Sequence, residues 1–246
     1  MNILRVIGGL CVIFGISLGI YGYLEDIFYF FNIGVGLILI GSIMTIFSYE
    51  KYEYDINTKL FNDYIDLIKR LIRSLEIENK GIVISKGGNI RSGVIFLPIE
   101  KDYRINLSLI DENILLVNSD NKKEMGLVFP LLGKSMLKIL EREEFSNINT
   151  ENLEDCLSYT LSLFNFGGDV VVEFKGREVI INYRIKNAEF CERMQKEKLC
   201  ERFPCHVCGF IILVISRVLN RMLKIEEIKK DKDRIRIRLM VLENEV

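Results

Sequence analysis

The amino-acid sequence predicts a membrane protein built from an N-terminal transmembrane helical hairpin and a cytosolic α+β domain, an antiparallel sheet with helices. Two observations lead to this fold class. The chain opens with two apolar runs of about 20 residues each, and shorter segments with strand-like or helix-like apolar spacing follow. We therefore divide the 246 residues into a hairpin at 1–50, an amphipathic connecting helix at 51–80 and the cytosolic domain at 81–246.

The hairpin rests on the runs 3–23 and 27–48, each long enough to cross about 30 Å of hydrocarbon as a helix. A cleaved signal peptide is excluded, because no small-x-small cleavage site follows the first run and a second run begins at once. The short connector Leu24-Glu25-Asp26 requires the helices to be antiparallel neighbours. Small residues recur every three or four positions on one face of each helix. This spacing favours close helix packing, either within the hairpin or between subunits of a homodimer.

The distribution of charge predicts the orientation of the hairpin. The connector carries Glu25 and Asp26, whereas Arg5 lies at the opposite end and Lys51 and Lys59 follow the second run. Positively charged flanks stay on the cytoplasmic side, so both termini are expected inside the cell. Aromatic residues cluster near both ends of the spans, as in interfacial belts. The predicted location is the cell membrane with two spans, and the lipid bilayer is the first expected partner.

The segment 55–78 has the apolar spacing of an amphipathic helix, with Leu60, Tyr64 and Leu67 on its apolar face. It could lie on the membrane, dimerise, or open the cytosolic domain. After it, alternation and turn residues predict strands at 82–84, 94–97, 104–110, 114–117 and 127–129, with Asp111-Glu112-Asn113 as a hairpin turn. Helices are predicted at 131–144 and, capped by Thr150, at 152–166. A hairpin at 170–174 and 178–184, a helix at 209–223 and strands at 225–229 and 234–239 complete the domain.

The charge balance limits the classes of partner. Lysine and arginine number 33 against 34 acidic residues, which argues against a broad nucleic-acid-binding surface. Arg234, Arg236 and Arg238 alternate with apolar residues and would occupy one face of a strand. We expect this face to be solvated and paired with neighbouring acids, so no nucleic acid is expected as a partner.

The second half carries a recognisable order of motifs. Phe166-Gly167-Gly168-Asp169-Val170-Val171 follows a helix, a strand hairpin passes through Tyr183, Phe203-Pro204-Cys205 opens the helix with Gly209, and Ile225-Glu226-Glu227 comes after it. In this order, residues 150–241 resemble the 4-vinyl reductase domain, an α+β module that binds small molecules. The whole arrangement also resembles uncharacterised archaeal membrane-anchored proteins. The resemblance implies a domain that binds a small hydrophobic ligand or a protein partner.

Four cysteines are concentrated at Cys191, Cys200, Cys205 and Cys208, and the single histidine, His206, lies among them. Structural disulfides are not the default in a reducing compartment. Thiolates bind Zn²⁺ tetrahedrally, so these residues, with His206 as an alternative fourth ligand, form a candidate metal site. The C-x4-C-x2-C spacing also matches an iron–sulfur motif. Reactive thiols and ordinary small buried side chains are the remaining interpretations.

Catalytic and nucleotide-binding motifs are missing from the sequence: it has no phosphate loop, G-x-G-x-x-G, H-E-x-x-H or G-x-S-x-G pattern. Leu132-Gly133-Lys134-Ser135 lacks the upstream glycine of a phosphate loop and is expected to be a turn before a helix. We therefore predict no catalytic residues and a non-enzymatic sensor or scaffold whose cytosolic domain binds a ligand or partner. The alternative is a membrane-tethered zinc, iron–sulfur or redox protein that uses the cysteines at 191–208.

Overall fold

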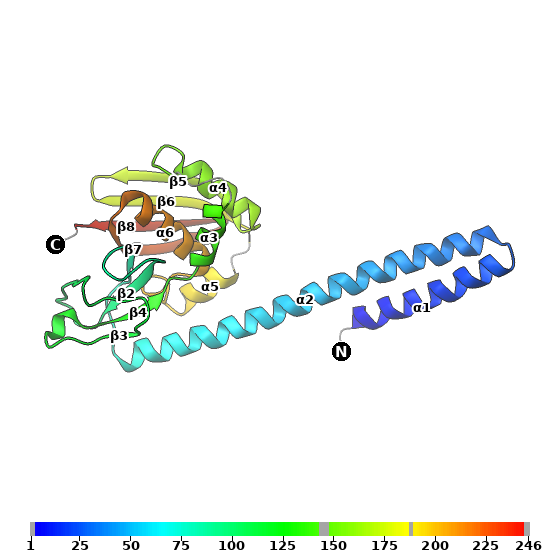
Figure 1. The fold of residues 1–246 in the computed structure, drawn as a ribbon, viewed down its shortest axis with the longest axis horizontal. Coiled ribbons are helices and arrows are strands. Elements are labelled where there is room, and N and C mark those ends of the chain that lie inside the picture. Colours follow the sequence, from blue (N-terminus) through cyan, green and yellow to red (C-terminus); the bar gives the residue numbers. More distant parts are fainter. Residues whose placement is uncertain (1–2, 143–147, 187–188, 244–246) are drawn as a thin grey trace. The chain divides into compact units, whose positions relative to one another are not determined.

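A computed structural model describes residues 3–142, 148–186 and 189–243, except for side chains in short stretches such as 47–61. The chain forms two compact units, 1–68 and 69–246. The N-terminal unit consists of α1 (Ile3–Leu24) and most of α2 (Phe28–Ser74) (Figure 1). Val6–Leu24 and Phe28–Ile46 are each long and apolar enough to cross a membrane, with a mean hydropathy of 1.9.

Glycines bring the backbones of α1 and α2 into contact. A methyl group on Gly34 would stand 2.6 Å from the backbone nitrogen of Gly19, and one on Gly15 would stand 2.7 Å from the carbonyl oxygen of Gly34. A methyl group on Gly8 would meet the carbonyl oxygen of Gly41 at 2.9 Å. The small residues therefore serve packing within the hairpin, because only glycine allows so close an approach.

The connecting segment departs from the prediction at both of its ends. No break separates it from the second apolar run, since α2 continues as one helix of 47 residues. The helix ends at Ser74 rather than near residue 78, and Glu76 follows in a left-handed conformation with φ of 50°. The side chains of the aromatic residues at 47–54, expected at one membrane interface, and the side chain of Leu60 are among those that the structure does not describe.

The C-terminal unit contains an antiparallel eight-stranded sheet in the order β3-β4-β2-β1-β7-β8-β6-β5. The strands are β1 (Ile82–Ile84), β2 (Val94–Pro98), β3 (Leu116–Val117), β4 (Gly126–Pro130), β5 (Gly167–Lys175), β6 (Glu178–Ile185), β7 (Met222–Asp231) and β8 (Arg234–Leu242). The helices are α3 (Lys134–Arg142), α4 (Leu153–Leu163), α5 (Glu189–Lys196) and α6 (His206–Leu219), with a short 3-10 turn at Lys122–Glu124. The predicted antiparallel sheet with helices is thus confirmed.

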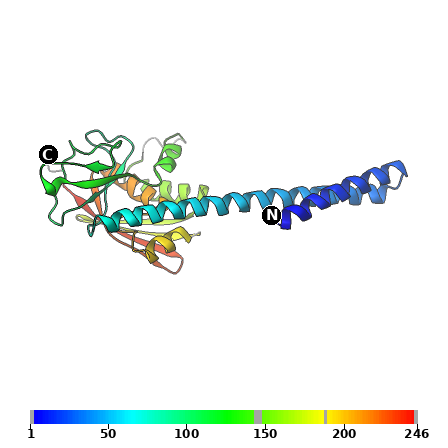
Figure 2. The same cartoon turned by 90° about the horizontal axis from the view of Figure 1, so that it is seen from below.

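Helix α6 forms the centre of the main core. Its residues Val207–Ser216 are all buried, as expected for a helix that is apolar on every side. It runs along one face of the sheet and contacts β1, β7, α3 and α4 (Figures 1 and 2). Gly133, at φ of 92°, allows the chain before α3 to reach α6, because a methyl group there would stand 2.3 Å from the carbonyl oxygen of His206. The predicted turn before a helix at 132–135 is thus confirmed.

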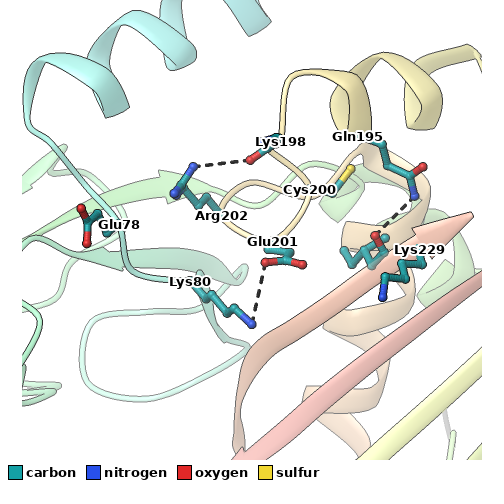
Figure 3. Close-up of a pocket in the computed structure, with 9 residues that line it drawn as sticks. Glu78, Lys80, Gln195, Lys198, Cys200, Glu201, Arg202 and Lys229 are labelled. Atoms are coloured by element: carbon teal, nitrogen blue, oxygen red, sulfur yellow. Dashed lines mark hydrogen bonds and ion pairs between the residues drawn. The ribbon is translucent and has the colours of Figure 1, made fainter.

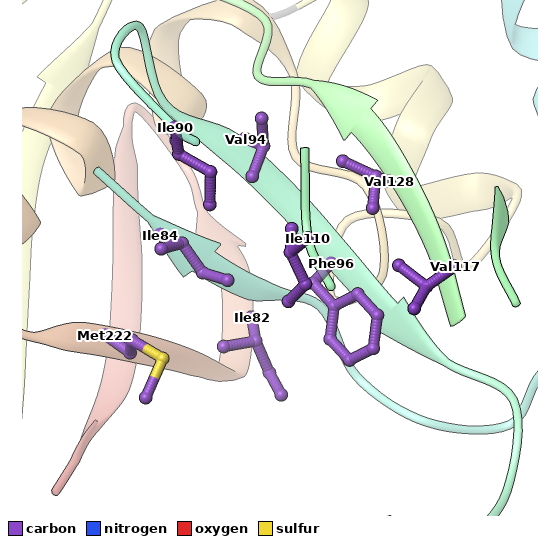
Figure 4. Close-up of a cluster of buried hydrophobic side chains, with 9 residues drawn as sticks. All are labelled: Ile82, Ile84, Ile90, Val94, Phe96, Ile110, Val117, Val128 and Met222. Atoms are coloured by element: carbon purple, nitrogen blue, oxygen red, sulfur yellow. The ribbon is translucent and has the colours of Figure 1, made fainter. Parts of the chain in front are cut away.

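A second core covers the other face of β1, β2 and β4. Figure 4 shows the buried cluster, whose members are Ile82, Ile84, Ile90, Val94, Phe96, Ile110, Val117, Val128 and Met222. The partly buried side chains of Tyr103, Ile105, Leu107 and Leu109 pack against it. The segment 99–115 therefore closes this core with side chains rather than with a strand.

The predicted strand at 104–110 and its hairpin to 114–117 were wrong. The Asn106 side chain accepts a hydrogen bond from the backbone N–H of Ser108 at 3.2 Å, and the Asp111 side chain accepts one from Asn113 at 2.8 Å. Such turns within one segment compete with strand pairing. Strand β3 instead pairs with β4, which lies inside the sheet between β3 and β2 rather than at an edge.

Smaller differences concern where the helices begin and end. Helix α4 has Asn152 rather than Thr150 as its N-cap, and α6 begins three residues earlier than predicted, at His206. Helix α6 ends at Leu219 because Asn220 adopts a left-handed conformation with φ of 50°, which asparagine tolerates. Helix α5 lies in the cysteine-bearing segment, for which the sequence predicted no helix or strand. The predicted end of the 131–144 helix falls at residues that the structure does not describe.

Candidate metal centre

Helices α5 and α6 bring three of the four predicted cysteines together. The Sγ atoms of Cys191, Cys205 and Cys208 all lie within 4.8 Å of one another. The Sγ of Cys191 is 3.2 Å from that of Cys205 and 3.7 Å from that of Cys208. Each residue is 1% exposed, so the three sulfurs form a closed group inside the domain.

The local sequence explains how two helix ends present these sulfurs. Cys205 is the N-cap of α6, with extended backbone angles of −64° and 168°, and Cys208 follows in the first turn. The N-cap residue and the residue three positions after it lie on the same side of a helix start. Cys191 comes from the first turn of α5. The loop between the helices is anchored by Phe203, whose ring packs edge-on against Phe129 with centroids 5.5 Å apart.

Electrostatics concentrate negative charge at Cys205. Hydrogen bonds with the thiols of Cys191 and Cys208 hold the pKa of Cys205 well below its usual value. The hydrogen bond between Cys191 and Cys205 raises the pKa of Cys191. Hydrogen bonds with Cys191 and Cys205 raise the pKa of Cys208 well above its usual value. The position at the start of α6 also favours a thiolate, because the helix dipole is positive there. These opposite shifts make Cys205 the thiol of the group that loses its proton most easily.

Tyr183 of β6 is the fourth member of the group. Its hydroxyl oxygen lies 3.3 Å from the Sγ of Cys208, and its side chain is completely buried. Burial, followed by the electrostatic effect of all three cysteines, raises the pKa of Tyr183 well above its usual value. In the sequence, Tyr183 marks only the strand hairpin and no site. The inward position of Tyr183 on an alternating strand was the signal that could have placed it near α6.

The other two predicted ligands lie outside this group. The Sγ of Cys200 donates a long hydrogen bond to the carbonyl oxygen of Cys191 at 3.9 Å, and Cys200 is not among the three clustered sulfurs. The ring of His206 packs edge-on against Phe166, with centroids 5.1 Å apart. His206 follows the N-cap directly, so its side chain leaves the helix in another direction than those of Cys205 and Cys208.

The three sulfurs fit a thiolate-bound metal ion. A tetrahedral zinc ion with Zn–S bonds of about 2.3 Å places its sulfurs about 3.8 Å apart. The Cys191–Cys208 separation of 3.7 Å matches this value, while the Cys191–Cys205 separation of 3.2 Å is somewhat shorter. A small outward shift of Cys205 would complete the fit. The described donor set contains sulfur and one hydroxyl, with no carboxylate or imidazole.

A separate pocket of about 460 Å³ opens beside the loop between α5 and α6 (Figure 3). Its walls carry four basic and two acidic side chains, which are Lys80, Lys198, Arg202, Lys229, Glu78 and Glu201. Ile228 and Cys200 form the apolar part of the wall. These walls are charged, so the pocket suits a polar ligand better than the hydrophobic ligand that the resemblance implies.

Comparison with known proteins identifies no relative: no family model, no curated protein and no solved structure matches the chain. The resemblance of residues 150–241 to the 4-vinyl reductase domain therefore stays a prediction.

Proposed function

We propose that the chain is a membrane-anchored protein whose C-terminal unit binds a structural zinc ion through Cys191, Cys205 and Cys208. The observation that carries this proposal is the convergence of three buried sulfurs from two helix ends. Thiolate ligands select soft metals, of which zinc is the one that forms closed structural sites. The role is structural rather than catalytic, because a catalytic zinc needs an open position that substrate can reach.

The hydroxyl of Tyr183 supplies the fourth ligand in this proposal. A tetrahedral zinc with bonds of about 2.3 Å to sulfur and 2.1 Å to oxygen places these atoms about 3.6 Å apart. The observed distance of 3.3 Å from Tyr183 to Cys208 is close to this value. The metal would join α5, the start of α6 and β6, and its binding free energy would become folding free energy.

The anchor is supported by the exposure of the apolar side chains of α1 and α2. Only 17% and 11% of the two most apolar windows are buried, unlike the core helix of a soluble protein. Ile13, Phe14 and Leu39 expose 64%, 67% and 59% of their surface. Side chains of this kind match the hydrocarbon of a bilayer. We propose two spans with both termini in the cytoplasm, on the charge distribution given above.

Metal analysis of the anaerobically purified full-length protein tests the zinc proposal. We expect about one zinc per chain, and its loss in Cys205→Ser together with several kcal/mol of unfolding free energy. Cys156→Ser is the matched control, because Cys156 on α4 is also 1% exposed but lies outside the cluster. It should keep the zinc and cost about 1–2 kcal/mol. Less than about a tenth of a metal per chain in the wild type would contradict the proposal.

A second candidate function is a sensor or scaffold module that binds a small ligand or a protein partner. The charged pocket beside the α5–α6 loop favours the ligand-binding form of this candidate. Both functions are compatible in one domain, since the zinc would stabilise the loop that forms one wall of the pocket.

A further inference from the structure

The pocket beside the α5–α6 loop has the size of a small-molecule site. Its volume of about 460 Å³ lies within the range of about 300–1,000 Å³ that is usual for ligand pockets. One wall is the loop that contains Lys198 and Arg202, and the opposite wall is the part of β7 that extends past the end of β1 (Figure 3). In this part of β7, the carbonyl oxygen of Ile228 accepts a hydrogen bond from the side-chain amide of Gln195 at 3.3 Å.

The acidic side chains of the pocket do not neutralise all of its basic ones. Lys80 is paired with Glu201 at 3.8 Å and with Glu226 at 3.2 Å, and Glu78 is paired with Lys101 at 2.7 Å. Lys229 is paired with Glu227. Lys198 and Arg202 have no acidic side chain within ion-pair distance among the described residues.

The guanidinium of Arg202 is held in place by the protein but keeps donors for a ligand. One terminal nitrogen donates a long hydrogen bond to the carbonyl oxygen of Lys198 at 3.5 Å. The Nε atom is buried and has no hydrogen-bond partner among the described residues. The donors left for a ligand are therefore on the two terminal nitrogens, which can give a bidentate pair of hydrogen bonds to an oxyanion.

Lys198 occupies a backbone position that would suit glycine better. Its φ is 56°, and its N–H closes the end of α5 with a hydrogen bond of 2.9 Å to the carbonyl oxygen of Gln195. Residues with side chains enter this left-handed region at an energetic cost. Lys198 lines the same wall as Arg202, so its long side chain can bring an ammonium group to a ligand bound there.

We infer that this pocket binds a small molecule through a phosphate group held by Arg202 and Lys198. Phosphate fits the site because it offers several oxygens to a planar guanidinium and a second charge to the ammonium group. The same chemistry is present in a soluble phosphate compound and in a phospholipid headgroup. This inference does not depend on the metal site, since neither cation belongs to the group of clustered cysteines.

Calorimetric titration of the full-length protein in phosphatidylcholine nanodiscs tests the inference, with inorganic phosphate as the first probe at constant ionic strength. Dihexanoyl phosphatidic acid is the second probe and represents the lipid source. We expect saturable binding that weakens about tenfold or more in Arg202→Gln, because a charge-assisted pair of hydrogen bonds is lost. Arg202→Lys should bind more weakly than wild type, because lysine keeps the positive charge but lacks the planar guanidinium that donates two parallel hydrogen bonds.

Lys198→Gly removes the second cation without destabilising the fold, because glycine adopts the positive φ of this position at lower cost than lysine. A loss of binding in this variant therefore cannot be attributed to unfolding. Lys232→Gly is its matched control: Lys232 also has a positive φ, of 54°, loses the same charge and lies in the turn between β7 and β8, outside the pocket. Only Lys198→Gly should weaken binding. Tighter binding of the phosphatidic acid than of inorganic phosphate would identify a lipid headgroup, and equal binding would identify a soluble phosphate. No saturable binding of either probe, or equal binding by all variants, would overturn the inference.

Discussion

At the scale of single residues, Tyr183 shows how a side chain without an obvious role becomes part of a site. It is fully buried on β6, and its hydroxyl oxygen lies 3.3 Å from the sulfur of Cys208. A buried hydroxyl normally requires a better acceptor than a thiol, which is a weak one. A thiolate–metal group at this position would give the hydroxyl a strong partner.

The change Tyr183→Phe should therefore weaken zinc binding while leaving the fold intact. Phenylalanine fills nearly the same space, so the core should lose little packing. The loss of the hydroxyl, the fourth ligand in this proposal, should reduce zinc affinity by at least the roughly 10–100-fold that is lost with groups that only support metal ligands. Competition with a chromophoric chelator measures this affinity. An unchanged affinity would show that Tyr183 is only a packing residue.

The residues of the site were predictable in part. The concentration of Cys191, Cys205 and Cys208 in a short segment was visible in the sequence, and the structure brings their sulfurs together. Cys200 and His206 could not be separated from them, because the helix was predicted to begin at Gly209, and the side-chain directions at 205–208 follow only from its actual start at His206. Tyr183 could not be assigned, since its contact with Cys208 spans 25 residues and depends on how the sheet packs against α6.

At the scale of elements, α4 shields the edge strand β5. The N–H groups of Val170 and Val172 point away from β6 and donate to the Oγ of Ser158 at 2.9 Å and to the Oε1 of Glu154 at 2.6 Å. Val171 and Phe174 on the same strand are each 44% exposed. A long edge strand with apolar residues is prone to pair with another chain, and these side chains occupy two of its donors.

Removing this protection should make the protein self-associate. The double change Glu154→Ala and Ser158→Ala frees both N–H groups for a second copy of β5. We expect a concentration-dependent increase in mass by sedimentation velocity in detergent. Asp155→Ala is the control, because it removes a neighbouring carboxylate of α4 that makes neither bond to β5. A double variant that sediments like the wild type would show that the edge needs no such protection.

The strands with regular alternation were the elements that could be predicted well. In β8, Ile235, Ile237 and Leu239 are buried while Arg234 and Arg236 are exposed, and Arg238 lies 3.6 Å from Glu178. The segment 104–110 has similar residues but forms no strand, because Asn106 and Asp111 make turns that interrupt it. The choice between these outcomes depends on local hydrogen bonds that apolar spacing does not reveal.

At the scale of the whole molecule, the proposal combines a two-span anchor with a metal-stabilised domain on the cytoplasmic side. A reporter that functions only in the cytoplasm should be active when fused after Val246. A reporter that functions only outside should be active when inserted at Glu25-Asp26, because the acidic connector is expected to face away from the cytoplasm. The reverse pattern of activities would contradict the orientation, and a full-length protein that is soluble without detergent would contradict the anchor.

X-ray absorption spectroscopy at the zinc edge tests the central claim most directly, because it reports the ligands of the metal in the full-length protein. The account predicts three sulfur atoms at about 2.3 Å and one oxygen at about 2.0–2.2 Å. Replacing Cys200 with serine should leave this spectrum unchanged, since Cys200 lies outside the cluster. A shell of four sulfurs that loses one in Cys200→Ser, or a shell with nitrogen ligands, would contradict the proposed centre.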